Sequence, residues 1–142
     1  AMGHCSQIAL GISLRRPERP VYCLDGDGAV LMHMGSLAII GAHAGKNYKH
    51  VVINNGAHES VGGQPTVAFD VDIPTVARAC GYKDVRRVVT ADELGEALTW
   101  LHEVEGPALL EVRVNTGARA DLGRPTKTPI ENRDELMRWL SS

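Results

Sequence analysis

The sequence has no long apolar run, no dense cluster of basic residues and few cysteines, and these absences exclude several classes of protein. No apolar run approaches the roughly 20 residues that a membrane-spanning helix needs, so no membrane partner is expected. The 15 lysines and arginines are outnumbered by 17 acidic residues and form no basic stripe, so nucleic acid is not an expected partner either. No signal peptide is visible at the start.

The three cysteines, Cys5, Cys23 and Cys80, do not have the spacing of a metal-binding motif. Their odd number favours reduced thiols and therefore a cytoplasmic location. Cys5 lies close to the loops discussed below and could be a nucleophile. No neighbouring residue singles it out for that role, so a small packing side chain is the preferred interpretation.

What the sequence does contain is the composition of a globular protein. Hydrophobic residues make up 44% of the 142 residues, enough for a sizeable core in one domain spanning 1–142. Alternating helix and strand patterns with short connections are typical of an α/β fold, with a mostly parallel sheet covered by helices on both faces. Helices are expected over about 4–15, 33–44, 72–81, from 90 onward and over 130–140, and strands over about 21–25, 49–53, 85–89 and 108–114.

Two of these helices begin with recognisable capping residues. Asp72 is expected to be the N-cap of the helix that carries Pro74 in its first turn. Thr90 and Glu93 have the spacing of a capping box at the start of the following helix. The glycine-rich segment 54–65 cannot be regular structure throughout.

The most informative pattern is Gly26-Asp27-Gly28, followed after 25 residues by Asn54-Asn55. Each motif follows an apolar strand, and parallel strands joined by a crossover end at the same edge of a sheet. Carboxylate and amide oxygens are ligands for hard divalent cations. Gly-Asp-Gly alone is also ordinary turn chemistry. The correctly spaced Asn-Asn favours a site for a metal-bridged phosphate.

These motifs resemble those of thiamine diphosphate-dependent decarboxylases. The segments that carry the resemblance are Gly26–Gly35, Asn54–Thr66, Met2–His4 and Asp121–Thr126. They are most similar to the phosphonopyruvate decarboxylase family, with sulfopyruvate decarboxylases as the nearest alternative. The resemblance covers essentially the whole chain but only the C-terminal, diphosphate-binding half of such an enzyme. It implies a thiamine diphosphate-binding fold, with thiamine diphosphate and Mg²⁺ as cofactors.

The resemblance assigns roles to the residues that match the family's motifs. Mg²⁺ would be bound by the Asp27 carboxylate, the Asn55 side-chain amide and the Ala57 main-chain carbonyl. Backbone N–H groups at the start of the helix after Asp27 would bind the diphosphate, and Met2 would lie under the cofactor and hold it bent. The cofactor-binding residues implied in this way are Met2, Gly3, His4, Gly26, Asp27, Gly28, Ala29, Asn55, Ala57 and His58.

Candidates for catalysis and substrate binding follow the metal ligands. His58 and Glu59 are titratable and placed where a general acid could reach the reacting carbon. Alternatively, they cap the next helix or face solvent. A backbone nest for the substrate's phosphonate could be formed by Ser60, Gly62, Gly63 and Gln64. The alternative interpretation is that Gly62 and Gly63 are needed only to let the backbone turn.

The basic residues of the segment 115–129 and the histidine at position 33 each allow a functional and a purely structural interpretation. Arg119, Arg124 and Lys127 lie in an arm that could close over a phosphonate, but a solvated surface loop is favoured because loops are commonly charged. His33 could lie under the diphosphate, yet a histidine packed near a helix start is favoured.

The resemblance also implies a partner. Family members take a glutamate from a pyrimidine-binding domain, usually of a neighbouring subunit, and nothing in this chain resembles that domain. The chain opens on a helical pattern with no strand before it, so it looks cut from something longer or made as one of two subunits. We therefore expect inactivity without the pyrimidine-binding half, and a homo- or hetero-oligomer with the site at the interface.

The implied reaction is decarboxylation of a small-molecule 2-oxo acid. In the phosphonopyruvate family it converts 3-phosphonopyruvate to phosphonoacetaldehyde and carbon dioxide, a step of phosphonate biosynthesis. One alternative is the beta subunit of a sulfopyruvate decarboxylase. The other is a non-catalytic module that keeps the fold for partner binding.

Overall fold

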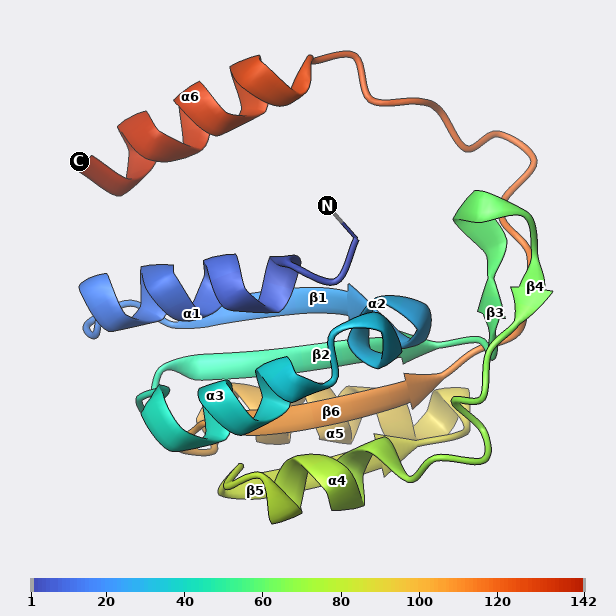
Figure 1. The fold of residues 1–142 in the computed structure, drawn as a ribbon, viewed down its shortest axis with the longest axis horizontal. Helices are drawn as coiled ribbons and strands as arrows, with labels where there is room; N and C mark the ends of the chain where they lie inside the picture. The colour runs from blue at the N-terminus through green and yellow to red at the C-terminus, as the bar shows by residue number, and fades with distance from the viewer. Residues whose placement is uncertain (1, 142) are drawn as a thin grey trace.

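Four parallel strands form the main sheet of the protein, and Figure 1 shows them side by side. The computed structural model describes residues 2–141. The strands are β1 (Val21–Gly26), β2 (Tyr48–Asn54), β5 (Asp84–Val88) and β6 (Ala108–Arg113). They lie in the order β1-β2-β6-β5, and all three neighbouring pairs are parallel. The predicted parallel sheet is confirmed.

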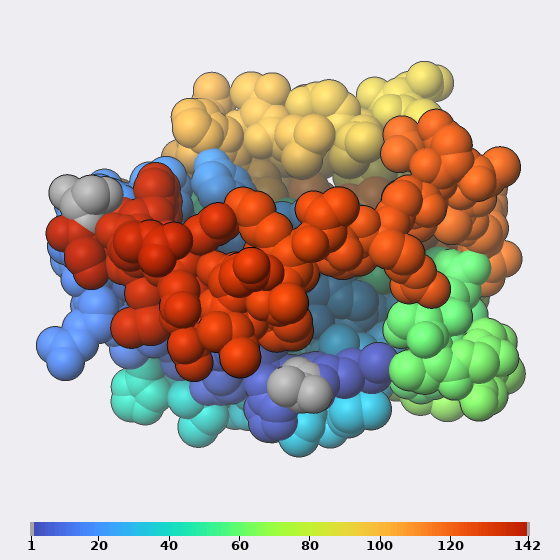
Figure 2. All heavy atoms as spheres, turned by 90° about the horizontal axis from the view of Figure 1, so that it is seen from above, coloured from blue at the N-terminus to red at the C-terminus, as the bar shows by residue number. Residues whose placement is uncertain are grey.

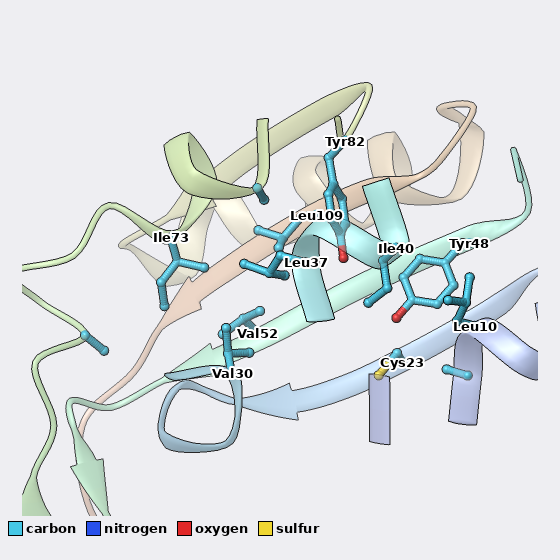
Figure 3. Packing of buried hydrophobic residues seen from close by; sticks show 13 residues of the cluster. Leu10, Cys23, Val30, Leu37, Ile40, Tyr48, Val52, Ile73, Tyr82 and Leu109 are labelled. Atoms are coloured by element: carbon cyan, nitrogen blue, oxygen red, sulfur yellow. The ribbon is translucent and has the colours of Figure 1, made fainter. Parts of the chain in front are cut away.

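Helices cover both faces of this sheet, as predicted. Adjacent residues of a strand point to opposite faces, and Val52 and Leu109 join one apolar cluster while their neighbours Val51 and Leu110 join another. The first cluster, drawn in Figure 3, lies under α1 (Cys5–Arg15), α3 (Gly35–His43) and α4 (Ile73–Ala79). The second lies under α5 (Ala91–Glu103). Such two-sided burial explains why β2 and β6 are almost continuously apolar.

The helix predicted over about 33–44 corresponds to α3, but a separate short helix that was not predicted precedes it. The chain forms α2 (Asp27–Met32) directly after β1, turns at His33 and Met34, and continues as α3. His33 has φ −130° and ψ 47°, which is not helical. Apolar residues keep a helical spacing across this turn, with Val30 in α2 and Leu37 in α3 both buried. The pattern therefore indicated a helix but not its break.

The remaining elements lie at the ends and edges of the sheet. The glycine-rich segment contains a small antiparallel pair, β3 (Ala57–His58) and β4 (Gln64–Pro65), joined by the 3-10 turn η1 (Glu59–Val61). The last helix, α6 (Pro129–Ser141), lies near α1 (Figure 1). Within residues 2–141 no helix is long and apolar enough to cross a membrane.

Both predicted helix caps are present. The Asp72 carboxylate accepts hydrogen bonds from the Thr75 backbone N–H at 3.3 Å and the Thr75 hydroxyl at 2.9 Å. These bonds from Thr75 hold the pKa of Asp72 below its ordinary value. At α5, Thr90 and Glu93 form the capping box, and hydrogen bonds from the Val89 and Thr90 backbone lower the pKa of Glu93.

The Asp72→Ala variant is expected to lower the free energy of unfolding by about 1 kcal/mol, because α4 loses its N-cap. Asp72→Asn should retain most of the stability, since Asn caps as well as Asp does. Urea denaturation measures the free energy of unfolding of both Asp72 variants, and Asp70→Ala, at an exposed position, is the control. Equal losses in the two Asp72 variants would mean that the ion pair with Arg87, at 2.8 Å, and not the cap, is the stabilising contact.

Candidate functional site

Asp27 and Asn55 lie beside each other at one edge of the sheet, as the spacing predicted. They follow Gly26 and Asn54, the last residues of the paired strands β1 and β2. A cleft of about 450 Å³ opens at this edge. It is lined by the predicted residues Met2, Gly26, Asp27, Gly28, Ala29, Asn55, Ala57, His58, Glu59 and Ser60, and also by Leu24, Asp25 and Ile53.

The Asp27 carboxyl group is buried and held in place. Asp27 is the first residue of α2 and is 2% exposed. One of its carboxylate oxygens accepts a hydrogen bond from the Thr66 hydroxyl at 2.6 Å, and the Thr66 oxygen in turn accepts from the Ala68 backbone N–H at 3.2 Å. Asp27 therefore presents an oriented carboxylate to the cleft.

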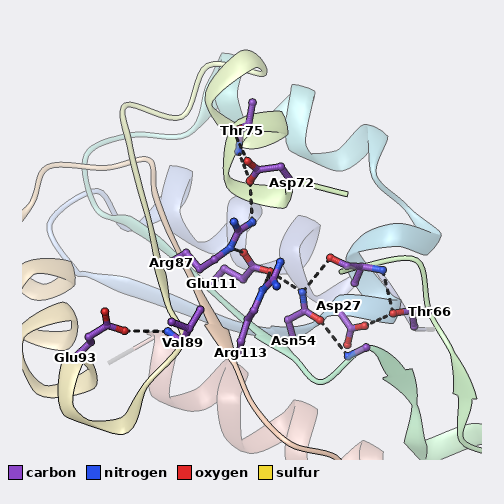
Figure 4. Close-up of polar contacts among 12 residues, drawn as sticks. Asp27, Asn54, Thr66, Asp72, Thr75, Arg87, Val89, Glu93, Glu111 and Arg113 are labelled. Carbon is purple, nitrogen blue, oxygen red and sulfur yellow. Dashed lines mark hydrogen bonds and ion pairs between the residues drawn. The ribbon is translucent and has the colours of Figure 1, made fainter. Parts of the chain in front are cut away.

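The two asparagines fix the turn that follows β2, and Figure 4 labels the first of them, Asn54. The Asn54 side-chain oxygen accepts from the Gly56 N–H at 3.1 Å, and the Asn55 side-chain oxygen accepts from the Ala57 N–H at 3.0 Å. Gly56 has φ +68°, and a Cβ there would lie 2.7 Å from the Phe69 ring. Only glycine suits this position, because side chains disfavour that φ and the ring fills the space.

A buried glutamate that the sequence analysis did not single out supports this turn. Glu111 on β6 is fully buried, and its Oε1 accepts from the Asn54 side-chain amide at 2.5 Å. Its Oε2 accepts from the Arg87 Nε, and the Arg113 Nε lies 3.7 Å from its Oε1. Figure 4 shows the side chains of Arg87, Glu111 and Arg113 close together beside Asn54. A charged residue inside the apolar run of β6 was the available signal, because charges are seldom buried unpaired.

The residues in the cleft fit a diphosphate held by a divalent cation. They bring a carboxylate, a side-chain amide and main-chain carbonyls together, and these oxygens suit Mg²⁺. Gly28 and Ala29 lie in the first turn of α2, where backbone N–H groups have no partner within the helix. Among residues 2–141, no atom outside its chain neighbours lies within 4 Å of the Cβ position of Gly26, so the backbone is open to a ligand there.

The three residues before α1 lie in different surroundings. Met2 lines the cleft. Gly3 is buried with φ +82°, and a Cβ there would lie 2.4 Å from the His33 ring. The His4 and His33 rings lie 4.3 Å apart, and neither lines the cleft. The packing interpretation of His33 therefore agrees with the structure, and Gly3 is required by that packing.

His58 and Glu59 both border the cleft. A Cβ on Gly28 would lie 2.4 Å from His58 Nδ1, so the imidazole packs directly on the Gly28 backbone. Glu59 is exposed and accepts two hydrogen bonds of 2.5 Å, from the Asn55 side-chain amide and from the Gly117 backbone N–H. It thus connects a predicted metal ligand to the arm that follows β6.

The four residues predicted to bind the substrate's phosphonate do not all lie in the cleft. Ser60 lines the cleft, whereas Gly62, Gly63 and Gln64 do not. Gly62 and Gly63 have φ +126° and +76°, and Gly63 N–H donates to the His58 carbonyl at 2.9 Å within the β3–β4 hairpin. The hairpin turn by itself explains these two glycines.

The arm after β6 passes beside the hairpin, where Figure 2 shows it in orange next to the green β3–β4 segment. Arg119 pairs with Asp121 at 3.5 Å and Lys127 with Glu135 at 2.6 Å. Both of these basic side chains and Arg124 are exposed, which agrees with a solvated loop.

The family model described as "Thiamine pyrophosphate enzyme, C-terminal TPP binding domain" matches residues 1–112. The chain belongs to this family. This TPP-binding domain is 47% identical over 131 residues to a phosphonopyruvate decarboxylase from Streptomyces viridochromogenes, which covers 92% of the chain and 33% of that relative. It is 38% identical over 98 residues to sulfopyruvate decarboxylase subunit beta from Methanococcus maripaludis, covering 69% of the chain and 52% of the relative.

A solved structure has the same fold as the TPP-binding domain. The thiamine diphosphate-dependent 4-hydroxybenzoylformate decarboxylase from Rhodococcus jostii RHA1 superposes with a TM-score of 0.65 at 23% identity, over 82% of this chain and 24% of that one. The chain thus spans about a third of the length of the phosphonopyruvate decarboxylase that it matches.

Proposed function

We propose that this chain is the diphosphate-binding part of a phosphonopyruvate decarboxylase, which releases carbon dioxide from 3-phosphonopyruvate and forms phosphonoacetaldehyde. The observation that carries the proposal is the 47% identity to the Streptomyces enzyme over 92% of the chain. The cleft beside Asp27 and Asn55 supports it, because its oxygen ligands and free N–H groups suit a magnesium diphosphate.

In this proposal, one set of residues in the cleft binds the cofactor and its metal ion. Asp27, Asn55 and the Ala57 carbonyl would hold Mg²⁺. Gly26 leaves its backbone open to the diphosphate, and Gly28 and Ala29 offer it the N–H groups of the first turn of α2. Met2, which lines the cleft, forms the wall on which the cofactor would rest, and Gly3 and His4, next to it in the chain, pack against His33. Bound thiamine diphosphate supplies the ring that accepts the electron pair when a 2-oxo acid loses carbon dioxide.

The substrate side of the cleft is formed by the loop after β2. We assign His58 as the group that moves a proton at the reacting carbon, with Glu59 next to it. We assign the phosphonate to Ser60, which lines the cleft, whereas Gly62, Gly63 and Gln64 lie outside it in the hairpin. Glu59 also holds the arm near the cleft through Gly117, which helps to exclude water.

The chain acts, in this proposal, as one domain over residues 1–142 that requires a pyrimidine-binding domain or subunit. The site is completed at an interface of a homo- or hetero-oligomer. A cytoplasmic location suits the three free cysteines, and phosphonate biosynthesis is the pathway class that makes such a product.

A second candidate is the beta subunit of a sulfopyruvate decarboxylase, favoured by the 38% identity to the Methanococcus maripaludis protein. The test combines this chain with a pyrimidine-binding half from the same source, thiamine diphosphate and Mg²⁺, and follows carbon dioxide release from phosphonopyruvate and sulfopyruvate in parallel. Preferential turnover of phosphonopyruvate is expected. Preference for sulfopyruvate overturns the substrate, and release from neither substrate favours a non-catalytic binding module.

The His58→Gln variant is expected to lower kcat about 100-fold or more in the assembled enzyme, because a positioned proton donor contributes that much. The cofactor dissociation constant should stay near its original value. The exposed His43→Gln on α3 is the control. An unchanged kcat with weaker cofactor binding would mean that His58 only supports the Gly28 backbone, on which it packs.

A further inference from the structure

Three buried side chains with metal-binding atoms converge next to the cofactor cleft. They are Cys23 and Asp25 on β1 and His50 on β2. The Cys23 sulfur, an Asp25 carboxylate oxygen and a His50 ring nitrogen all lie within 4.8 Å of one another. Residues two apart on a strand share a face, and Cys23 is paired in register with His50, so the sheet itself brings the three together.

Two atoms of this cluster have no hydrogen-bond partner among residues 2–141. Asp25 Oδ2 and His50 Nε2 lie 3.5 Å apart, on side chains that are 4% and 1% exposed. Buried polar atoms are nearly always hydrogen-bonded. The two atoms face each other at ion-pair distance with the Cys23 thiol beside them, and all three residues offer atoms that can bind a metal ion.

The surroundings of His50 and Cys23 match those of a metal site. His50 Nδ1 lies 3.0 Å from the Tyr82 hydroxyl, which orients the ring as an outer partner of a metal-bound histidine does. The Cys5 sulfur on α1 lies 3.6 Å from the Cys23 sulfur. Two thiolates on one tetrahedral Zn²⁺ lie about 3.8 Å apart, given Zn–S bonds of about 2.3 Å.

We propose that Cys23, Asp25 and His50 bind one Zn²⁺ ion, with Cys5 as the fourth ligand. Thiolate, imidazole and carboxylate are the ligands of tetrahedral zinc, whereas the neighbouring cleft offers only oxygens, which suit Mg²⁺. The three buried ligand atoms have to approach one another by up to about 1.5 Å, since tetrahedral zinc separates such atoms by about 3.3–3.8 Å. Cys5 is exposed and lies outside this group of three, so its sulfur has to turn toward them. Spacing along the sequence gave no sign of this set, because its members come from three different elements.

The ion would tie α1, β1 and β2 together immediately before Gly26 and Asp27. Burial, with the neighbouring Cys5 and Asp25, raises the pKa of the Cys23 thiol, so the metal-free chain holds it protonated. Binding therefore releases the thiol protons of Cys23 and Cys5 to solvent as two Zn–S bonds form, with no change in oxidation state. Asp25 also borders the cofactor cleft, so the ion would fix the wall of that cleft.

The test uses the reduced full chain and Co²⁺, a spectroscopic substitute for Zn²⁺. One equivalent of Co²⁺ is expected to give a thiolate-to-metal charge-transfer absorption that one equivalent of Zn²⁺ removes. Absence of this absorption from the reduced wild-type chain overturns the proposal. Asp27→Asn should leave the absorption unchanged, so the result does not depend on the proposed function.

Variants locate the ligands. Cys23→Ser should abolish or strongly reduce the absorption, and Cys5→Ser should reduce it, while Cys80→Ser, the matched control, leaves it unchanged. Tyr82→Phe should weaken Zn²⁺ binding about 10- to 100-fold as the loss of an outer partner, and His50→Gln should weaken it at least as much. Circular dichroism checks the fold of each. Equal absorption in Cys23→Ser and wild type would also overturn the proposal.

Discussion

The Asp27→Asn variant, assembled with the pyrimidine-binding half, is expected to lose at least about 100-fold in kcat/KM, since even an outer partner of a metal ligand contributes 10- to 100-fold. Asparagine keeps the shape of the side chain and an oxygen that can accept from Thr66. It removes the negative charge from a residue that is 2% exposed. The loss therefore reports the metal interaction and not a change of packing.

The measurement is turnover as a function of Mg²⁺ concentration. The concentration that gives half-maximal turnover should rise in Asp27→Asn, and the exposed Asp70→Asn serves as the matched control. Normal turnover of the Asp27 variant at the same Mg²⁺ concentration would contradict the assignment of Asp27 as a metal ligand. It would also revive the interpretation of Gly-Asp-Gly as a turn.

The Glu111→Ala variant is expected to lower the free energy of unfolding by about 3 kcal/mol, because it removes one partner of a buried ion pair. Arg87 and Arg113 would lose their shared carboxylate, and Asn54 would lose the acceptor of its amide. Both guanidinium side chains are 30% exposed and Arg87 keeps Asp72, so water and Asp72 partly offset the loss. The cost should therefore fall at the lower end of the range for buried pairs.

Glu111→Gln separates charge from shape in the same experiment. The amide oxygen can still accept from Asn54, so this variant should be destabilised less than Glu111→Ala. The exposed Glu96→Gln, which removes the surface pair with Arg86, should change stability by less than about 1 kcal/mol. Urea denaturation compares the three, and equal stability of Glu111→Ala and Glu96→Gln would contradict a supporting role for the buried network.

The same network has a consequence for the site. Asn54 binds Glu111 with its amide and the Gly56 N–H with its oxygen, so it joins β6 to the turn that carries Asn55. A rise in the Mg²⁺ concentration that gives half-maximal turnover in Glu111→Gln would be the sign that this connection orients the metal ligand.

Local patterns in the sequence determined much of this protein. The apolar runs of β2 and β6, the caps at Asp72 and Thr90, and the two motifs at Asp27 and Asn55 each depend on residues close in the chain. Parallel strands then force both motifs to one edge, so the place of the cleft also followed from the sequence. The assigned roles of the cleft residues, by contrast, stay predictions.

Only the tertiary structure decided the features that depend on contacts between distant segments. The break at His33 is one, because apolar spacing continues through it. The Glu111–Asn54 pair joins residues 57 positions apart, and His50 meets Cys23 and Asp25 only because β1 and β2 pair in that register. Side chains brought together by strand pairing have no fixed spacing in the chain, whereas caps and strand-end motifs do.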